Sequence, residues 1–250
     1  MSDWTWAAAS QRGTTHVAIG EGRQDAYRVL AVAGFLIIVA CDGAGSVRHG
    51  RLGAVIATRM LAQRAVEWVS RHNRLPSPSM LEMWVAEMRL AIFVHAGRRG
   101  CAMGEFASTL VLVISDGLST FTAHIGDGAV VGRCAKTNKF IALSWPDGGQ
   151  YVSTTFFLTD EVVRLRIGIA TDIAVVQLAA LTDGLERLAL DFTNRSAHAP
   201  FFASMFAPFG SIAASGRDRK LSEQLATYLS SDQVNARTND DKTLVLAALR

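Results

Sequence analysis

Aspartate residues mark the ends of several apolar segments in this 250-residue chain. The five concerned are Asp25, Asp42, Asp127, Asp183 and Asp240, each beside a run expected to form a strand. A carboxylate at the end of a buried strand is costly unless it is solvated, paired or bound to a cation. Several that converge repel one another and need a compensating positive charge. Hard divalent cations such as Mg²⁺ and Mn²⁺ provide that charge, because they take oxygen ligands from carboxylates, backbone carbonyls and water.

Glycine directly follows three of these aspartates, at positions 43, 128 and 184. A glycine in that place lets the backbone approach a bound metal closely. The alternative is a simple turn, since Asp-Gly is a common turn dipeptide, and for any one aspartate alone the turn is the better interpretation. Five aspartates at strand ends, taken together, favour a metal site.

The segments around these aspartates form an ordered set along the chain. They are Gln24-Asp25-Ala26, Cys41-Asp42-Gly43-Ala44-Gly45-Ser46, Phe106-Ala107-Ser108-Thr109-Leu110, Ile125-Gly126-Asp127-Gly128, residues 151–160, Leu181-Thr182-Asp183-Gly184-Leu185 and Asp240-Asp241-Lys242-Thr243. The set resembles the metal-dependent serine/threonine protein phosphatases of type 2C, the PPM family, in their compact bacterial form. The resemblance runs from about Gly13 to the C-terminus. It implies an α+β fold, a four-layer αββα sandwich of two mainly antiparallel sheets flanked by helices, with residues 1–250 as one type 2C-like phosphatase domain.

The resemblance also implies a cleft at one end of the sandwich that holds two Mg²⁺ or Mn²⁺ ions. Carried over residue by residue, Asp42 would bridge the two ions, and the Gly43 carbonyl would bind one of them. Asp183 and Asp240 would complete the shell of the other ion. Asp25 would act mainly through bound water.

The implied chemistry is hydrolysis of phosphoserine and phosphothreonine in proteins. Two cations about 3.5–4 Å apart lower the pKa of a bridging water, and the resulting hydroxide attacks phosphorus in line. Asp42 and Asp183 would thereby be catalytic, with no covalent phosphoenzyme, and Asp127 could help to hold a third, weaker ion. The implied partners are a phosphorylated protein substrate and a cognate serine/threonine kinase in a signalling system. The alternative is a phosphatase-like binding or regulatory module with weak or absent activity.

Two positions beside the first aspartates depart from the family pattern. Gln24 stands where the family often has Glu, which would weaken the water shell of one metal. Ala44 stands where many eukaryotic members have a His that is a candidate general acid. Protonation of the leaving group would then fall to a metal-bound water.

The phosphate-binding Arg of the family has no direct counterpart, since an ungapped match places Gly20 there. Arg23 is the catalytic candidate for this role, because on a strand it would share one face with Asp25, about 7 Å away. Arg12 and His16 are the other candidates.

Hydrophobic periodicity predicts the elements that position these residues. Strands are expected over residues 29–32, 35–40, 108–114, 120–125, 129–133, 140–143, 162–170, 173–181 and 243–249, and helices over 52–71, 80–96 and 219–229. Ala33-Gly34 is expected to form a tight turn. Helices grouped apart from runs of strands argue for a layered α+β domain. The irregular stretch 145–160 is expected to border the cleft, His124 to be a hydrogen-bonded core residue, and Cys41 to be buried.

Composition excludes several other classes of protein. Half the residues are hydrophobic and the net charge is only +3, which argues against disorder. Scattered basic residues argue against nucleic-acid binding. Three distant cysteines without CxxC spacing argue against disulfides and structural zinc. The longest apolar run, residues 29–41, is shorter than the roughly twenty that span a bilayer, and residues 1–12 lack a signal-peptide pattern. A cytoplasmic protein with no membrane partner is expected.

Overall fold

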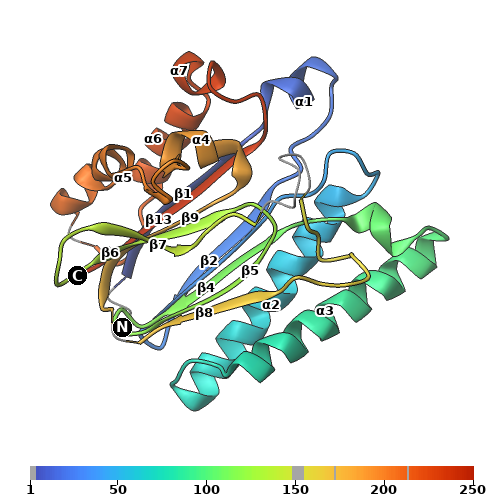
Figure 1. Cartoon of the computed structure of the whole chain (residues 1–250), viewed down its shortest axis with the longest axis horizontal. Coiled ribbons are helices and arrows are strands. Elements are labelled where there is room, and N and C mark those ends of the chain that lie inside the picture. Colours follow the sequence, from blue (N-terminus) through green and yellow to red (C-terminus); the bar gives the residue numbers. More distant parts are fainter. Residues whose placement is uncertain (1–3, 148–154, 172, 213) are drawn as a thin grey trace.

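Two β-sheets packed face to face form the centre of the computed structural model, which describes residues 4–147, 155–171, 173–212 and 214–250 (Figure 1). The first sheet has the order β12-β1-β13-β9-β6-β7, with bounds Gly216–Arg217, Trp4–Gln11, Lys242–Leu249, Val175–Leu181, Ala129–Cys134 and Phe140–Ser144. The second has the order β2-β3-β4-β5-β8, with bounds Ala26–Val32, Phe35–Cys41, Leu110–Ser115, Thr120–Ile125 and Arg166–Ala170. Every pairing between the described strands is antiparallel except that of β1 with β12.

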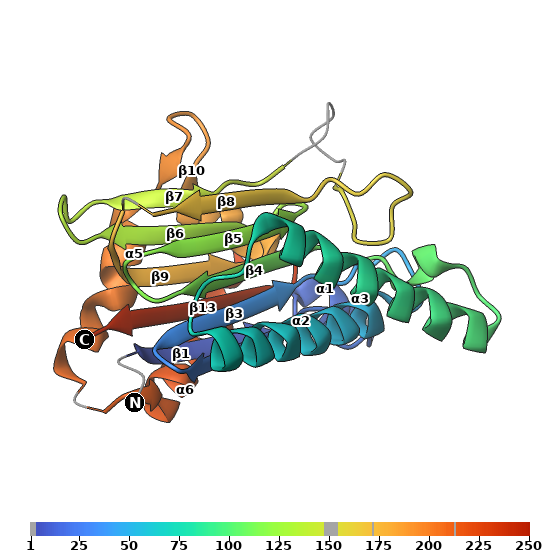
Figure 2. The ribbon, with the colours of Figure 1, turned by 90° about the horizontal axis from the view of Figure 1, so that it is seen from below.

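Helices cover the outer face of each sheet (Figures 1 and 2). The second sheet carries two long helices, α2 (Gly50–His72) and α3 (Pro78–Arg99). The shorter elements are α4 (Glu186–Ala189), α5 (Ala199–Phe206), α6 (Arg219–Leu229) and α7 (Asp232–Asn235), with α1 (Thr14–Ala18), η1 (Met103–Phe106), η2 (Asp183–Leu185), η3 (Ala207–Ser211) and the ribbon β10 (Leu190–Asp191) and β11 (Ser196–Ala197). Among them α4, α5, α6 and α7 pack on the first sheet. The predicted αββα sandwich is therefore confirmed.

Three apolar layers result from this stacking. Strand β3 lies between two of them, and its sequence is apolar at every position. Leu36, Ile38 and Ala40 pack in the layer between the sheets. Ile37 and Val39 point the other way, into the layer beneath α2 and α3. A strand buried on both faces has no solvent side and therefore no polar alternation.

The β2–β3 hairpin matches the expected tight turn. Ala33 and Gly34 both have positive φ, 52° and 83°, as a two-residue turn requires when its twist follows that of the strands. Both long helices and α6 also form as predicted, each within a few residues of its expected ends.

Several strand starts and several elements differ from the expectation. Strand β2 begins at Ala26 rather than residue 29, and β13 at Lys242 rather than 243. Strand β8 begins at Arg166 rather than residue 162, because Val162 is 79% exposed in a turn and has no core to face. Strand β9 begins at Val175 rather than 173, and β4 at Leu110 rather than 108. The pattern missed β1, which is rich in alanine and has few β-branched residues. It also missed the short helices α1, α4, α5 and α7. No helix in the described ranges is long and apolar enough to cross a membrane.

Candidate active site

The strand registers bring the five aspartates to one end of the sandwich. In the second sheet Ala26, the first residue of β2, pairs with Cys41, the last of β3. In the first sheet Leu181, the last residue of β9, pairs with both Ala129 and Leu244. The residues that adjoin these paired ends are Asp25, Asp42, Asp127, Asp183 and Asp240. Segments that are more than two hundred residues apart in sequence therefore meet at one edge.

Asp25 links the two sheets through hydrogen bonds from two threonines. Its Oδ2 accepts from Oγ1 of Thr182 at 2.8 Å and from Oγ1 of Thr243 at 2.5 Å. Its side chain is 2% exposed, and its Oδ1 has no hydrogen-bond partner among the described residues. One carboxylate oxygen is thus fixed while the other remains available to a ligand.

Asp42 and Gly43 are held by the segment that precedes β4. The backbone N–H of Thr109 donates to the Asp42 carbonyl at 2.8 Å, and the Asp42 N–H donates to Oγ1 of Thr109 at 3.0 Å. Gly43 forms a bridge with Ser108. A Cβ on Gly43 would overlap the carbonyl group of Gly50 at the start of α2, so only glycine permits this packing.

Asp127 lies beside residues of the stretch expected to border the cleft. Oγ1 of Thr155 donates to its Oδ2 at 2.5 Å, while its Oδ1 is buried without a partner in the described part of the chain. Leu158 N–H donates to the Ser108 carbonyl at 2.8 Å. The described end of that stretch therefore contacts the aspartate site, and residues 148–154 lie outside the described ranges.

Burial and mutual repulsion raise the pKa of these carboxyl groups. Burial raises the pKa of Asp25 to about 6. Burial, and then the charges of Asp25, Asp183 and Asp240, hold the pKa of Asp42 well above its usual range. The pKa of Asp183 is also held well above its usual range, by burial and then by Asp127, Asp240 and Asp25. Each carboxylate thus opposes the ionisation of the others, as expected for a cluster that needs a cation.

The donor chemistry of this cluster fits divalent cations. Its oxygen atoms are the ligand type that Mg²⁺ and Mn²⁺ prefer. The Oδ1 atoms of Asp25 and Asp127 are buried and accept no hydrogen bond in the described structure. The side chains alone do not form a complete metal-ligand set, because no group of three or more His, Cys, Asp or Glu in the described residues is arranged to hold an ion. Mg²⁺ sites commonly combine few carboxylates with several waters, so the shells would be completed by solvent.

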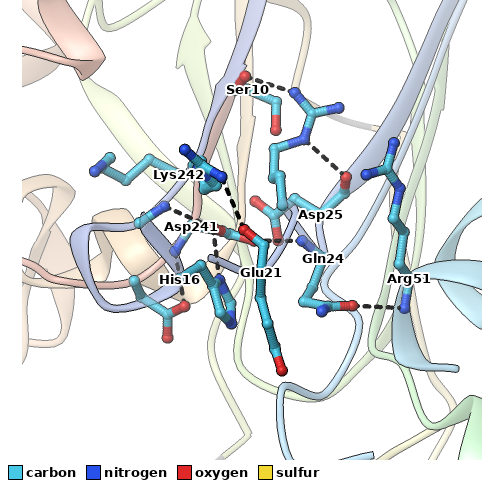
Figure 3. A network of polar contacts seen from close by, with 12 residues as sticks. Ser10, His16, Glu21, Gln24, Asp25, Arg51, Asp241 and Lys242 are labelled. Atoms are coloured by element: carbon cyan, nitrogen blue, oxygen red, sulfur yellow. Dashed lines mark hydrogen bonds and ion pairs between the residues drawn. The ribbon is translucent and has the colours of Figure 1, made fainter. Parts of the chain in front are cut away.

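Asp241 is a residue that the sequence interpretation missed. It is 1% exposed and accepts hydrogen bonds from the backbone N–H of Gly13 at 2.6 Å and of Gln24 at 2.5 Å (Figure 3). Nδ1 of His16 lies 2.9 Å from its Oδ1. It therefore fastens α1 and the segment before Asp25 to the start of β13. The only sequence signal was a second aspartate directly after Asp240.

The candidates for phosphate binding are held in different ways. Arg23 donates from Nη1 to the Ser10 carbonyl at 2.6 Å and from Nε to the Asp25 carbonyl at 3.1 Å. Arg12 donates to the Glu21 carbonyl at 2.9 Å. Burial disfavours a charged His16, but the hydrogen bond and charge of Asp241 outweigh it and raise its pKa. The structure brings Arg23 beside the backbone of Asp25, with two of its donors already used by carbonyl groups.

His124 and Cys41 lie in the core as predicted. His124 is fully buried, and its Nδ1 lies 2.7 Å from Oγ of Ser144. Burial, followed by the nearby charge of Arg166, lowers the pKa of His124 to about 3. This imidazole therefore stays neutral at physiological pH. Cys41 is buried at the end of β3.

The raised pKa values of Asp42 and Asp183 predict that the metal-free protein loses stability as pH rises from about 4, the ordinary pKa of Asp, to the pH at which each group ionises in the folded chain. The effect is measured between pH 6.5 and 8.5. A carboxyl group whose pKa is higher in the folded than in the unfolded chain binds more protons when folded, so the free energy of unfolding falls with rising pH. His124 does not oppose the trend between these two pH values, because its lowered pKa affects stability only below about pH 6.5. Each carboxyl group that still holds its proton in the folded chain over these two pH units lowers Tm by roughly 5 °C or more.

Thermal unfolding in EDTA at the two pH values measures this effect. Mg²⁺ should raise Tm more at pH 8.5 than at pH 6.5, because cations bind the ionised carboxylates. In Asp42→Asn the dependence on pH should be weaker. A metal-free Tm that rises between pH 6.5 and 8.5 would contradict the placement of these buried carboxyl groups.

Comparison with known proteins agrees with this geometry. The family model of protein phosphatase 2C matches residues 12–230. Serine/threonine-protein phosphatase 3 of Escherichia coli K12 is 34% identical over 253 aligned residues, covering 98% of both chains. In fold, the chain is similar to the Mycobacterium tuberculosis phosphatase PstP/Ppp (TM-score 0.66, 15% identity, 99% of each chain). It is also similar to PppA of Pseudomonas aeruginosa (TM-score 0.65, 17% identity, 99% of this chain and 98% of that one).

A carboxylate site at the end of a two-sheet sandwich, together with these relatives, defines a serine/threonine phosphatase, a hydrolase of phosphate esters. The chain belongs to the protein phosphatase 2C family, in its bacterial form. Members of this family generally depend on Mg²⁺ or Mn²⁺, and their substrates are phosphoproteins. The resemblance inferred from the ordered aspartate segments is thereby confirmed.

Proposed function

We propose that this chain hydrolyses phosphoserine and phosphothreonine in proteins at a site that holds two Mg²⁺ or Mn²⁺ ions. The observation that supports this most strongly is the convergence of Asp25, Asp42 and Asp183, whose pKa values are raised by burial and by one another. When bound, two such ions would activate water for in-line attack and stabilise charge on the phosphoryl oxygens. The proposal includes a serine/threonine kinase that supplies the substrate.

Different residues of the chain would bind each of the two ions. Asp42 would lie between the two ions, with the Gly43 carbonyl on one and Asp183 and Asp240 on the other. The hydrogen bonds that fix the Asp42 backbone to Thr109 support this assignment, since a ligand must be held in place.

Asp25 and Asp127 each have one carboxylate oxygen that accepts hydrogen bonds and one that has no partner in the described structure. Thr182 and Thr243 orient Asp25, and Thr155 orients Asp127. The unpartnered Oδ1 atoms would bind metal-shell waters at Asp25 and a third, weaker ion at Asp127.

We further propose that residues 1–250 form one catalytic domain. The family match ends at residue 230 and begins at 12, but β1 and β13 lie outside it and pair along their whole length, from Trp4 with Leu249 to Gln11 with Lys242. Strand β13 lies between β1 and β9 in the first sheet, and β1 lies between β12 and β13, which supports counting both strands as part of the domain.

Metal dependence of turnover tests the proposed function. Hydrolysis of para-nitrophenyl phosphate and of a phosphothreonine peptide is expected with Mn²⁺ or Mg²⁺, and loss of activity in EDTA should be reversed by excess metal. A folded protein that is inactive with either ion would favour the alternative of a phosphatase-like binding module. Full activity in EDTA would exclude the metal assignment.

A further inference from the structure

A polar groove of about 370 Å³ runs between strand β2 and helix α2, and it starts at the aspartate site. It is lined by Arg23, Asp25, Ala26, Tyr27, Arg28, Val29, Leu30, Arg51, Val55, Thr58 and Arg59. Asp25 is common to the groove and the aspartate site. A molecule whose phosphate is at the carboxylates therefore has a path for its neighbouring atoms along this groove.

One wall of the groove is an edge strand. Strand β2 pairs with β3 and with no other strand in the described structure. Five consecutive residues, 26–30, line the groove, and at about 3.3 Å per residue they provide roughly 13–17 Å of strand edge. An edge strand is a template for an added extended segment. The wall is long enough for about four residues of such a segment.

The opposite wall is a single face of α2. Arg51, Val55, Thr58 and Arg59 are spaced by four, seven and eight residues from the first, which places them on one side of a helix. The backbone N–H of Arg51 donates to Oε1 of Gln24 at 2.9 Å, which fixes the start of α2 against the segment before Asp25 (Figure 3). The groove is thus bounded by two regular elements with arginines at both ends of the helical wall.

Four guanidinium groups, from Arg23, Arg28, Arg51 and Arg59, line the groove. The acid among its lining residues is Asp25, which is almost fully buried. In the described structure none of the four arginines lies within 4.0 Å of a carboxylate, whereas Arg64, further along α2, pairs with Glu67 and Glu87. The lining of the groove therefore has more positive than negative side chains, which favours the binding of carboxylates and other anions.

We propose that this groove binds acidic residues that flank the phosphorylated Ser or Thr of the substrate, as an extended segment beside β2. The proposal rests on the proposed function, since it names the substrate class of the same site. The edge strand supplies backbone partners, and the arginines supply charge-assisted hydrogen bonds to Asp or Glu side chains. The enzyme would thereby select phosphorylation sites in acidic surroundings.

The test compares matched phosphothreonine peptides with three Glu or three Gln on one flank, for each flank in turn. The variant is Arg28→Ala/Arg59→Ala, and the control is Arg98→Ala/Arg99→Ala, an equal change of charge at the exposed end of α3. For the wild type and the control, kcat/KM should be about tenfold higher with the acidic peptide on one flank. The groove variant should lose most of this preference through KM. Its Tm should stay within a few degrees of wild type, and its hydrolysis of para-nitrophenyl phosphate should stay within about twofold.

Binding provides a second readout that does not depend on turnover. The inactive Asp42→Asn protein should bind a fluorescent acidic phosphopeptide more tightly than its Gln counterpart, and adding the two arginine substitutions should remove the difference. Equal kcat/KM for Glu and Gln peptides on both flanks would overturn the proposal. A third peptide with a phosphoserine in place of the flanking Glu residues is measured in the same assay. A preference for it without one for Glu would also overturn the proposal, because the groove would then be a phosphate site. If the wild type did not hydrolyse para-nitrophenyl phosphate with either metal ion, that result would instead contradict the proposed function.

Discussion

Asp42→Asn and Asp183→Asn are each expected to lower kcat about a thousandfold, since the proposed metal site would supply several kcal/mol of transition-state stabilisation and each 1.36 kcal/mol is tenfold. An amide keeps the size of the side chain and one oxygen but removes the charge that attracts a cation. Both residues lie where the carboxylates of the two sheets converge. The measurement is steady-state hydrolysis of para-nitrophenyl phosphate at saturating Mn²⁺.

The same substitutions should stabilise the metal-free protein. Burial and neighbouring charge hold the pKa of each carboxyl group well above its usual range, so at neutral pH ionisation is opposed by the fold. Replacing one carboxyl group removes part of that repulsion, and Tm in EDTA should rise. A gain in stability with a loss of activity is typical of functional sites.

Asp232→Asn is the matched control for both measurements. Asp232 is an exposed residue of α7 and belongs to none of the aspartate segments, so the same chemical change there should leave kcat and Tm nearly unchanged. Activity that survives Asp42→Asn would exclude Asp42 as a metal ligand. A large fall in Tm in the same variant would show a mainly structural role.

Gly184→Ala is expected to disrupt both folding and activity. A Cβ at this position would overlap the backbone carbonyl oxygen of Asp241, and backbone atoms cannot move aside as a flexible side chain can. Gly184 follows Asp183, and Asp241 follows Asp240, so any shift separates the two aspartates. Overpacking of this kind costs about 1–3 kcal/mol or more, and a displacement of about 1 Å at reacting groups costs about a hundredfold in rate. Denaturant unfolding and metal-dependent turnover measure the two effects.

Gly97→Ala is the control for the glycine substitution. Gly97 lies on the exposed side of α3, and a Cβ there would meet no heavy atom within 4 Å. Since alanine has the higher helix propensity, this variant should be stabilised by up to about 1 kcal/mol with unchanged turnover. If Gly184→Ala behaved in the same way, the close contact between Gly184 and the backbone of Asp241 would be wrong.

The sequence predicted the three longest helices, α2, α3 and α6, and most strands, because each has a strong local pattern. Strand β3 is apolar at every position, and α2 and α3 follow helical periodicity over five or six turns each. Strand β1 lacked such a signal, and its alanines become strand through pairing with β13 rather than through their own preference. Residues 162–165, before β8, were wrongly predicted to be strand. Their apolar side chains suggested burial, but local sequence does not show whether other elements pack against a segment.

The chemistry of the candidate site was also present in the sequence. Carboxylates beside buried strands need a cation or solvent whatever the fold, so aspartate residues at several strand ends predicted the ligand type. The structure adds that they meet at one end of the sandwich and raise the pKa of one another. That result depends on strand register, which sets which strand ends are neighbours.

The partners of each site residue were decided only by the tertiary structure. Asp25 is oriented by Thr182 and Thr243, 157 and 218 residues away, and Asp241 fastens Gly13, 228 residues away. Sequence spacing on a strand placed Arg23 near Asp25, but only the fold shows that its donors bind backbone carbonyls. The groove beside β2 likewise needs both an unpaired strand edge and a helix that lies along it. Local pattern fixes what a segment can form and which chemistry its side chains offer, whereas contacts between distant segments depend on how whole sheets and helices pack.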